Sequence, residues 1–106
     1  MHKMHNITDE EWKICLEYFS DSCAYCGMTL EDHLNKYKER LHREHVIHDG
    51  DNELSNCVPS CKICNSQKHT YTLEEWYNEN NSKFTSDRMD RILTWMYYDS
   101  INIQAG

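Results

Sequence analysis

The chain has 106 residues, with 11 Lys or Arg and 18 Asp or Glu, which gives a formal net charge of −7 at pH 7. This length suits one domain, which we expect to span residues 1–106. No apolar run approaches the ~18 residues of a membrane span, and the first residues lack the apolar stretch of a signal peptide. We therefore expect a cytoplasmic protein with no membrane partner.

The first third of the chain predicts two helices joined by a cysteine turn. Residues 8–11, Thr-Asp-Glu-Glu, form a capping-box pattern, and apolar residues at helical spacing follow, so a helix is expected over 9–20. In Cys23-Ala-Tyr-Cys26-Gly27, the glycine suits a tight turn with positive φ. Thr29 can then cap a short helix over 30–38.

The middle of the chain predicts a strand, a turn, a second strand and a helix. The first strand is expected within 41–48, and the Asp-Gly-Asp-Asn segment 49–52 is a strong turn signal. A second strand is expected near 56–58. Pro59-Ser60 would then open a helix that runs from 61 or 62 to 69.

Two further helices are predicted after this middle part. Residues 72–75, Thr-Leu-Glu-Glu, can cap a helix that ends near 78, and apolar residues at helical spacing follow Ser86. The expected fold class is α+β, with a strand–strand–helix core over about 23–69 and helical flanks over 8–20 and 72–98.

Four of the six cysteines form two Cys-x-x-Cys pairs, which are Cys23 with Cys26 and Cys61 with Cys64. Two such pairs complete a tetrahedral four-sulfur zinc site, which is closed and therefore structural. The alternative is two unrelated pairs of thiols. Cys15 lies in a helical apolar pattern and is most simply a buried small hydrophobic residue.

An acid-His dipeptide, Glu44-His45, lies between the two cysteine pairs, with Asn56 further along and Asn65 directly after the last cysteine. With these residues the sequence resembles the HNH endonuclease family, which has a ββα-metal fold. The resemblance covers about residues 23–69, and residues 72–77 are also similar to phage and bacterial members. It implies a metal-dependent endonuclease that hydrolyses DNA phosphodiester bonds, by nicking or by double-strand cleavage.

The chemistry of hydrolysis suggests a role for each of these residues. Neutral imidazole has a pKa near ~6.5, so His45 can serve as the general base that activates water. Glu44 and Asn65 are the expected ligands of a catalytic divalent ion. By resemblance, Asn56 braces the loop and fixes the imidazole. His69, four residues after Asn65 on a helix, is a candidate third ligand; the alternative is a solvated helix residue.

The sequence departs twice from the commoner family pattern, and both departures bear on the metal. Glu44 stands where Asp is usual, which lengthens the reach of the carboxylate by one methylene. Asn65 stands where the family name has its final His. Oxygen ligands favour magnesium or manganese, whereas a site that includes His69 makes nickel more competitive.

The acidic net charge is unusual for a protein whose expected partner is DNA. Basic residues nevertheless flank the proposed site, and they are the expected DNA contacts: Lys36, Lys38, Arg40, Arg43, Lys62 and Lys68. Two alternatives stay open. One is a catalytically weak, zinc-stabilised module that binds nucleic acid or protein, and the other is a nuclease subunit of a phage packaging complex. We expect the protein to be encoded by a phage and to act in the cytoplasm of a bacterial host cell.

Overall fold

The computed structural model describes residues 6–105, and it begins with two capped helices. Helix α1 spans Asp9–Tyr18 and α2 spans Leu30–Tyr37. Thr8 accepts a hydrogen bond from the backbone of Glu11, whose carboxylate returns one to the backbone of Thr8, so the expected capping box is present. Helix α1 ends two residues earlier than expected, because the chain turns with positive φ at Ser20 and Asp21.

The centre of the fold is an antiparallel pair of strands. Strand β1 spans His42–His45 and β2 spans Cys57–Ser60, with His42 opposite Ser60 and His45 opposite Cys57. A single 3₁₀ turn, Leu54–Asn56, leads into β2. The expected helix start at 61 or 62 is confirmed, because α3 begins at Lys62 with Cys61 as its N-cap; Pro59 and Ser60 belong to β2.

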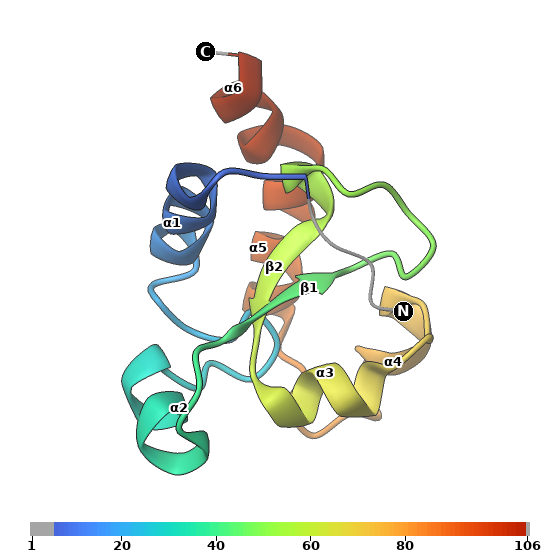
Figure 1. Cartoon of the computed structure of the whole chain (residues 1–106). Helices are drawn as coiled ribbons and strands as arrows, with labels where there is room; N and C mark the ends of the chain where they lie inside the picture. The colour runs from blue at the N-terminus through green and yellow to red at the C-terminus, as the bar shows by residue number, and fades with distance from the viewer. Residues whose placement is uncertain (1–5, 106) are drawn as a thin grey trace.

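Helices α3 (Lys62–Lys68) and α4 (Leu73–Trp76) follow the hairpin, as Figure 1 shows. Buried His33 links α2 to α3, because its Nε2 accepts a 3.0 Å hydrogen bond from the backbone N–H of Lys62. Helix α4 is shorter than expected and ends at Trp76. The strand–strand–helix order, with helices on both sides, confirms the α+β class.

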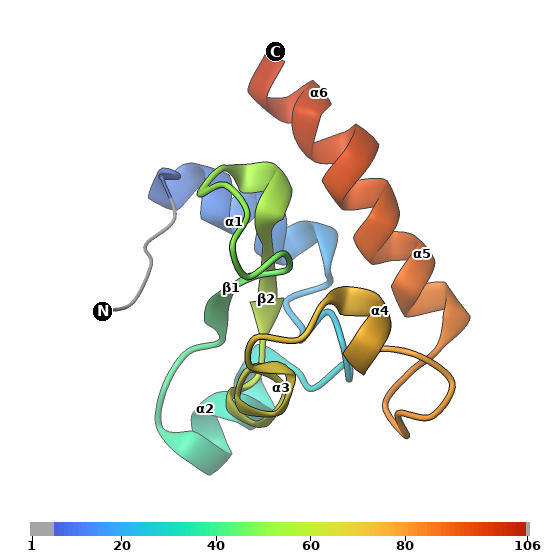
Figure 2. The same cartoon turned by 90° about the vertical axis from the view of Figure 1, so that its right-hand side faces the viewer.

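The last helix runs along one side of the molecule, as Figure 2 shows, and extends beyond its expected end at 98. It comprises α5 (Ser86–Thr94), a π-helical segment (Trp95–Asp99) and α6 (Ser100–Ala105). The indole N–H of buried Trp95 donates a 2.9 Å hydrogen bond to the carbonyl of Cys57 in β2. This bond joins the C-terminal helix to the hairpin.

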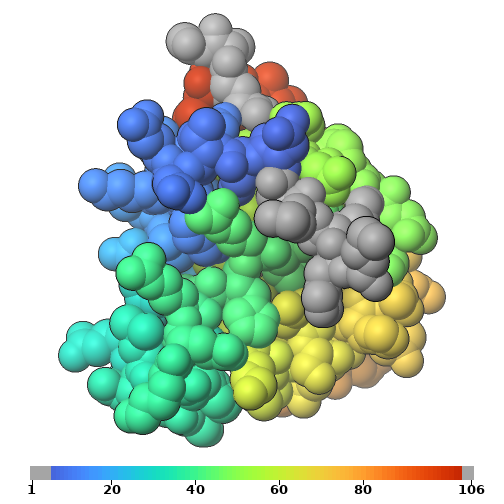
Figure 3. Space-filling model, viewed as in Figure 1, coloured from blue at the N-terminus to red at the C-terminus, as the bar shows by residue number. Residues whose placement is uncertain are grey.

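One apolar core lies between the hairpin and these helices. It includes Cys15, Phe19, Tyr25, Leu41, Val46, Leu54, Val58, Leu73, Tyr77, Ile92, Trp95 and Met96. In Figure 3 the residues around β1 reach the surface between α1, α2 and α3. Within residues 6–105, the helices all fall short of the length and apolar character that crossing a membrane requires.

Candidate functional site

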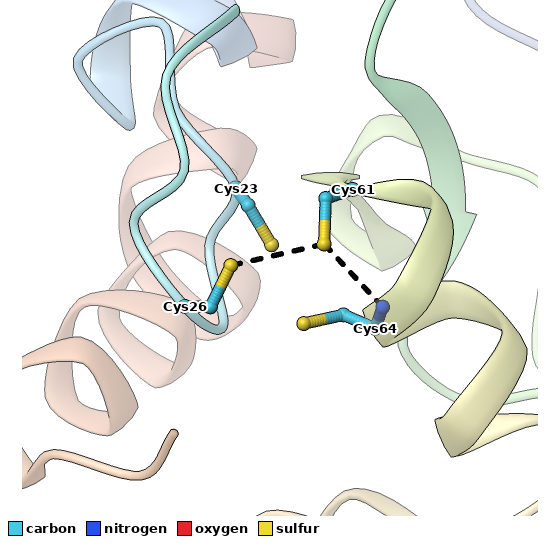
Figure 4. A group of neighbouring side chains, drawn as sticks. All are labelled: Cys23, Cys26, Cys61 and Cys64. Carbon is cyan, nitrogen blue, oxygen red and sulfur yellow. Dashed lines mark hydrogen bonds between the residues drawn. The ribbon is translucent and has the colours of Figure 1, made fainter. Parts of the chain in front are cut away.

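The four expected cysteines come together at the junction of the first turn and α3 (Figure 4). Cys61 caps the N-terminus of α3, Cys64 lies in its first turn, and Cys23 and Cys26 come from the turn after α1. The four sulfur atoms lie within 4.8 Å of one another, and the Cys26 and Cys61 sulfurs are 3.7 Å apart. Tetrahedral Zn–S bonds of ~2.3 Å put sulfur atoms ~3.8 Å apart, so the cluster fits a structural metal ion.

Backbone hydrogen bonds hold the first cysteine turn in place. The N–H of Gly27 donates to the carbonyl of Cys23 at 2.9 Å, and the N–H of Ala24 donates to the carbonyl of Pro59 at 2.8 Å. Gly27 has φ +81°, which disfavours any residue with a Cβ atom. The turn is therefore attached to β2 independently of its sulfur atoms.

Glu44 points from β1 into the interior, and its side chain is 6% exposed. The hydroxyl of Tyr25, which lies inside the first Cys-x-x-Cys pair, donates a 2.5 Å hydrogen bond to its Oε2. Burial, and then the Glu44 charge, raise the pKa of Tyr25 well above its usual value, so the hydroxyl keeps its proton. The carboxylate that the sequence suggested as a metal ligand is thus a buried one.

Lys68 is the buried counter-charge of Glu44. Its ammonium lies 3.8 Å from Glu44 Oε1, donates to the carbonyl of Val46 at 2.6 Å and lies 3.4 Å from the carbonyl of His45. Burial lowers the pKa of Lys68, although the Glu44 charge acts in the opposite direction. Because the Lys68 side chain is 0% exposed, the structure removes it from the expected DNA-contacting residues.

Asn65, the other expected ligand, lies on α3 against His42 of β1. The Asn65 Nδ2 donates to His42 Nδ1 at 2.9 Å, and His42 Nε2 donates to Glu39 at 3.0 Å. The bond from His42 lowers the pKa of Glu39. The sequence did not indicate a role for His42. Its signal was the two-residue spacing to Glu44, which places both side chains on one face of a strand.

His45 ends β1 and lies on the opposite face of the strand from Glu44. Its Nε2 is 2.9 Å from the side-chain oxygen of Asn52, a contact that the sequence did not suggest. Asn56 is 3% exposed and is hydrogen-bonded to Ile47 and Asp51. The contact to the imidazole, which the resemblance assigned to Asn56, is thus made by Asn52.

His69 lies outside the helix that was expected to carry it. Helix α3 ends at Lys68, and His69 has φ 47° and ψ −118°, which are not helical values. As the C-cap of α3, His69 still donates its backbone N–H to the carbonyl of Asn65 at 3.1 Å, and the chain leaves the helix at this residue.

The remaining basic residues are exposed, and two of them converge on one ring. The ammonium groups of Lys36 and Lys62 lie 5.5 and 5.8 Å from the centre of the Tyr37 ring. Lys38 donates to the Asn35 carbonyl, and Arg40 is exposed. Arg43 pairs with Asp9 and lies over the Trp12 ring.

The expected residues Glu44, Asn65 and His45, together with His42, thus form two groups. Glu44, His42 and Asn65 lie on the side of β1 that faces α3, whereas His45 contacts the loop after β1. Among residues 6–105, only the four cysteines form a group of three or more Cys, His, Asp or Glu side chains close enough to hold an ion. Any catalytic ion would therefore need Asn65, solvent or substrate oxygens as additional ligands.

Comparison with known proteins shows which family the sequence matches. Residues 23–71 match the family model described as HNH endonuclease. The chain is also 48% identical over 100 residues to "SPbeta prophage-derived putative HNH endonuclease YoqL" of Bacillus subtilis (strain 168). That match covers 90% of this chain and 44% of the relative, so the chain spans less than half of the relative's length.

Proposed function

Because the chain belongs to the HNH endonuclease family, we propose that it is a metal-dependent endonuclease that hydrolyses phosphodiester bonds of DNA. The observation that carries this proposal is the position of His45 at the end of β1, in a hairpin whose second strand leads directly into the cysteine cluster at the start of α3. The product, a nick or a double-strand break, depends on whether one or two copies act at a site.

His45 is the proposed general base. A neutral imidazole next to the scissile phosphate takes a proton from the attacking water, and imidazole is suited to this at neutral pH. Asn56 supports it indirectly, because its hydrogen bonds to Ile47 and Asp51 hold the loop that contacts the imidazole.

Glu44 and Asn65 are the proposed protein ligands of a catalytic divalent ion. A carboxylate and an amide oxygen suit magnesium or manganese, and nickel would need imidazole ligands in addition. The hydrogen bond from Tyr25 to Glu44 supports this role, because ligating carboxylates usually have such a partner. The ion supplies positive charge near the phosphate oxygens and the leaving oxygen. The cysteine cluster is proposed to hold zinc, whose role is structural.

Five exposed basic residues are the proposed DNA contacts: Lys36, Lys38, Arg40, Arg43 and Lys62. If each contacts one phosphate, the logarithm of affinity should fall with the logarithm of salt with a slope of about −4.5, because each contact contributes about −0.9. Replacing both Lys36 and Lys62 with Ala should make that slope shallower by about 2.

The direct experiment is nicking of supercoiled plasmid with and without EDTA. His45→Ala should cut the rate by at least ~100-fold, the low end for loss of a general base, while folding and zinc content stay unchanged. His48→Ala is the matched control, because His48 is exposed and only three residues away. Equal rates for wild type and His45→Ala would disprove the assignment.

The net charge of −7 favours a second candidate, a nuclease subunit that a basic partner delivers to DNA, as in phage packaging machinery. A prophage-derived relative fits a phage-encoded protein that acts in the cytoplasm of a bacterial host. Metal-dependent nicking by the isolated chain at physiological salt would argue against a required partner. Metal-independent binding of DNA or protein without any cleavage would instead support a zinc-stabilised binding module.

A further inference from the structure

The loop between β1 and β2 reaches back to the imidazole of His45. Asn52 lies seven residues after His45, and its Oδ1 is 2.9 Å from His45 Nε2. Both side chains are half-buried. The contact therefore joins the loop to the proposed general base.

The loop is held closed from inside by Asn56. The Asn56 Oδ1 accepts from the N–H of Ile47 at 2.8 Å, and its Nδ2 donates to the carbonyls of Ile47 at 3.0 Å and Asp51 at 2.9 Å. Gly50 fits against this brace so closely that a Cβ atom there would lie 2.8 Å from Asn56 Nδ2. A loop with this many internal bonds presents its side chains in a fixed geometry.

Asn52 itself is fixed on both sides. Its backbone carbonyl accepts a 2.6 Å hydrogen bond from the N–H of Asn6, and the next residue, Glu53, donates its N–H to the Asp51 side chain at 3.1 Å. The backbone of Asn52 is thus anchored independently of His45.

The chemistry of this contact selects one form of the imidazole. Neutral histidine carries its proton on either Nδ1 or Nε2. An amide oxygen only accepts hydrogen bonds, so Asn52 Oδ1 stabilises the form with the proton on Nε2. In that form Nδ1 carries the lone pair that can take a proton.

We propose that Asn52 is a positioning residue, which holds the His45 ring with its proton on Nε2 and so makes Nδ1 the basic atom. This rests on the proposed function, since His45 is taken as the base. It assigns to Asn52 a task separate from that of Asn56: Asn56 braces the loop and Asn52 orients the ring.

The test reads the tautomer directly by ¹⁵N NMR of histidine-labelled, zinc-loaded protein above pH ~8, where an ordinary imidazole is neutral. Wild type should show the Nε2-protonated form of His45. Asn52→Ala should give a mixture of the two forms, and Asn52→Asp, which keeps an acceptor oxygen, should retain the wild-type form. Asp51→Ala is the matched control, because its side chain accepts a hydrogen bond from the N–H of Glu53 in the same loop.

A wild-type spectrum with the proton on Nδ1 would overturn the proposal, and so would equal shifts in Asn52→Ala and Asp51→Ala. In plasmid nicking at saturating metal and DNA, Asn52→Ala should lose at least about tenfold in rate. The loss should stay below the ~10⁴-fold known for a base held in the wrong tautomer, and Asn52→Asp should recover most of it. Absence of nicking by wild type would refute the proposed function alone, because the NMR result does not depend on cleavage.

Discussion

The hydroxyl of Tyr25 donates a hydrogen bond to the carboxylate of Glu44, and this bond joins the cysteine cluster to the proposed catalytic ligand. Tyr25 is held at the other end by Tyr77, whose hydroxyl donates to the Tyr25 carbonyl at 2.6 Å. The orientation of Glu44 is thus set from within the first Cys-x-x-Cys turn.

Tyr25→Phe should therefore weaken the catalytic metal site without releasing zinc. Loss of a hydrogen bond to a ligand typically costs 10- to 100-fold in metal affinity, so the manganese concentration for half-maximal nicking should rise by at least about tenfold. Manganese binding, measured by calorimetry, should weaken in parallel. Tyr77→Phe is the control, since it also removes a buried hydroxyl; an equal shift there would mean that the turn had only loosened.

Cys61→Ser should give unfolded or insoluble protein, because a structural zinc contributes about 10 kcal/mol or more of folding free energy in small zinc peptides. Zinc analysis measures the loss of the metal ion, and circular dichroism measures the loss of helical structure. Cys15→Ser provides the comparison, because Cys15 lies outside the cluster and its sulfur donates to the Cys57 carbonyl at 3.4 Å. A folded, zinc-free Cys61→Ser protein would show that the cluster is not a structural metal site.

Lys68→Met should destabilise the fold by about 3–5 kcal/mol, because it leaves the buried carboxylate of Glu44 without its counter-charge. Urea unfolding measures this difference. Adding Glu44→Gln to Lys68→Met should restore part of the stability, since the unpaired charge is then gone. If Lys68→Met alone changes stability by less than about 0.5 kcal/mol, as ordinary surface changes do, the ammonium is not a buried partner.

His69→Ala should leave the metal requirement of nicking unchanged, since His69 lies beyond the end of α3 with a non-helical backbone. Rates should be compared over a range of magnesium and manganese concentrations. EDTA should stop both proteins at levels that leave the structural zinc bound, because the catalytic site is the weaker one. If His69→Ala changes the magnesium or manganese concentration needed for nicking, His69 is a ligand of the catalytic ion.

Stability should fall between pH 10 and about 12, in part because of Tyr18. Burial and a 2.6 Å hydrogen bond to Asp99 raise the pKa of Tyr18 from 10 to about 12. The protonated form is favoured by folding, so this contribution is complete below pH 10 and is lost as the pH rises through about 12. Tyr18→Phe should show a shallower loss of unfolding free energy over this range, and parallel curves would contradict the assignment.

The sequence allowed the cysteine cluster and most element types to be predicted, because their signals are local. Cys-x-x-Cys spacing and the caps at Thr8, Thr29 and Thr72 depend on neighbours a few residues away. The burial of Lys68 depends on Glu44, which lies 24 residues earlier. The sequence around a lysine does not reveal such a distant partner. The Asn52 contact likewise exists only once the loop folds back. Helical spacing likewise does not reveal the positive φ of His69, the residue at which α3 ends.

The bond from the Ala24 N–H to the Pro59 carbonyl has a consequence for the order of folding. The two cysteine pairs are separated by a loop of 34 residues between Cys26 and Cys61, so zinc gains all four ligands only after that loop has closed. The Ala24 amide becomes protected when the turn docks on β2. Its hydrogen exchange rate therefore reports the docking of the turn on β2, whereas metal analysis reports the binding of zinc.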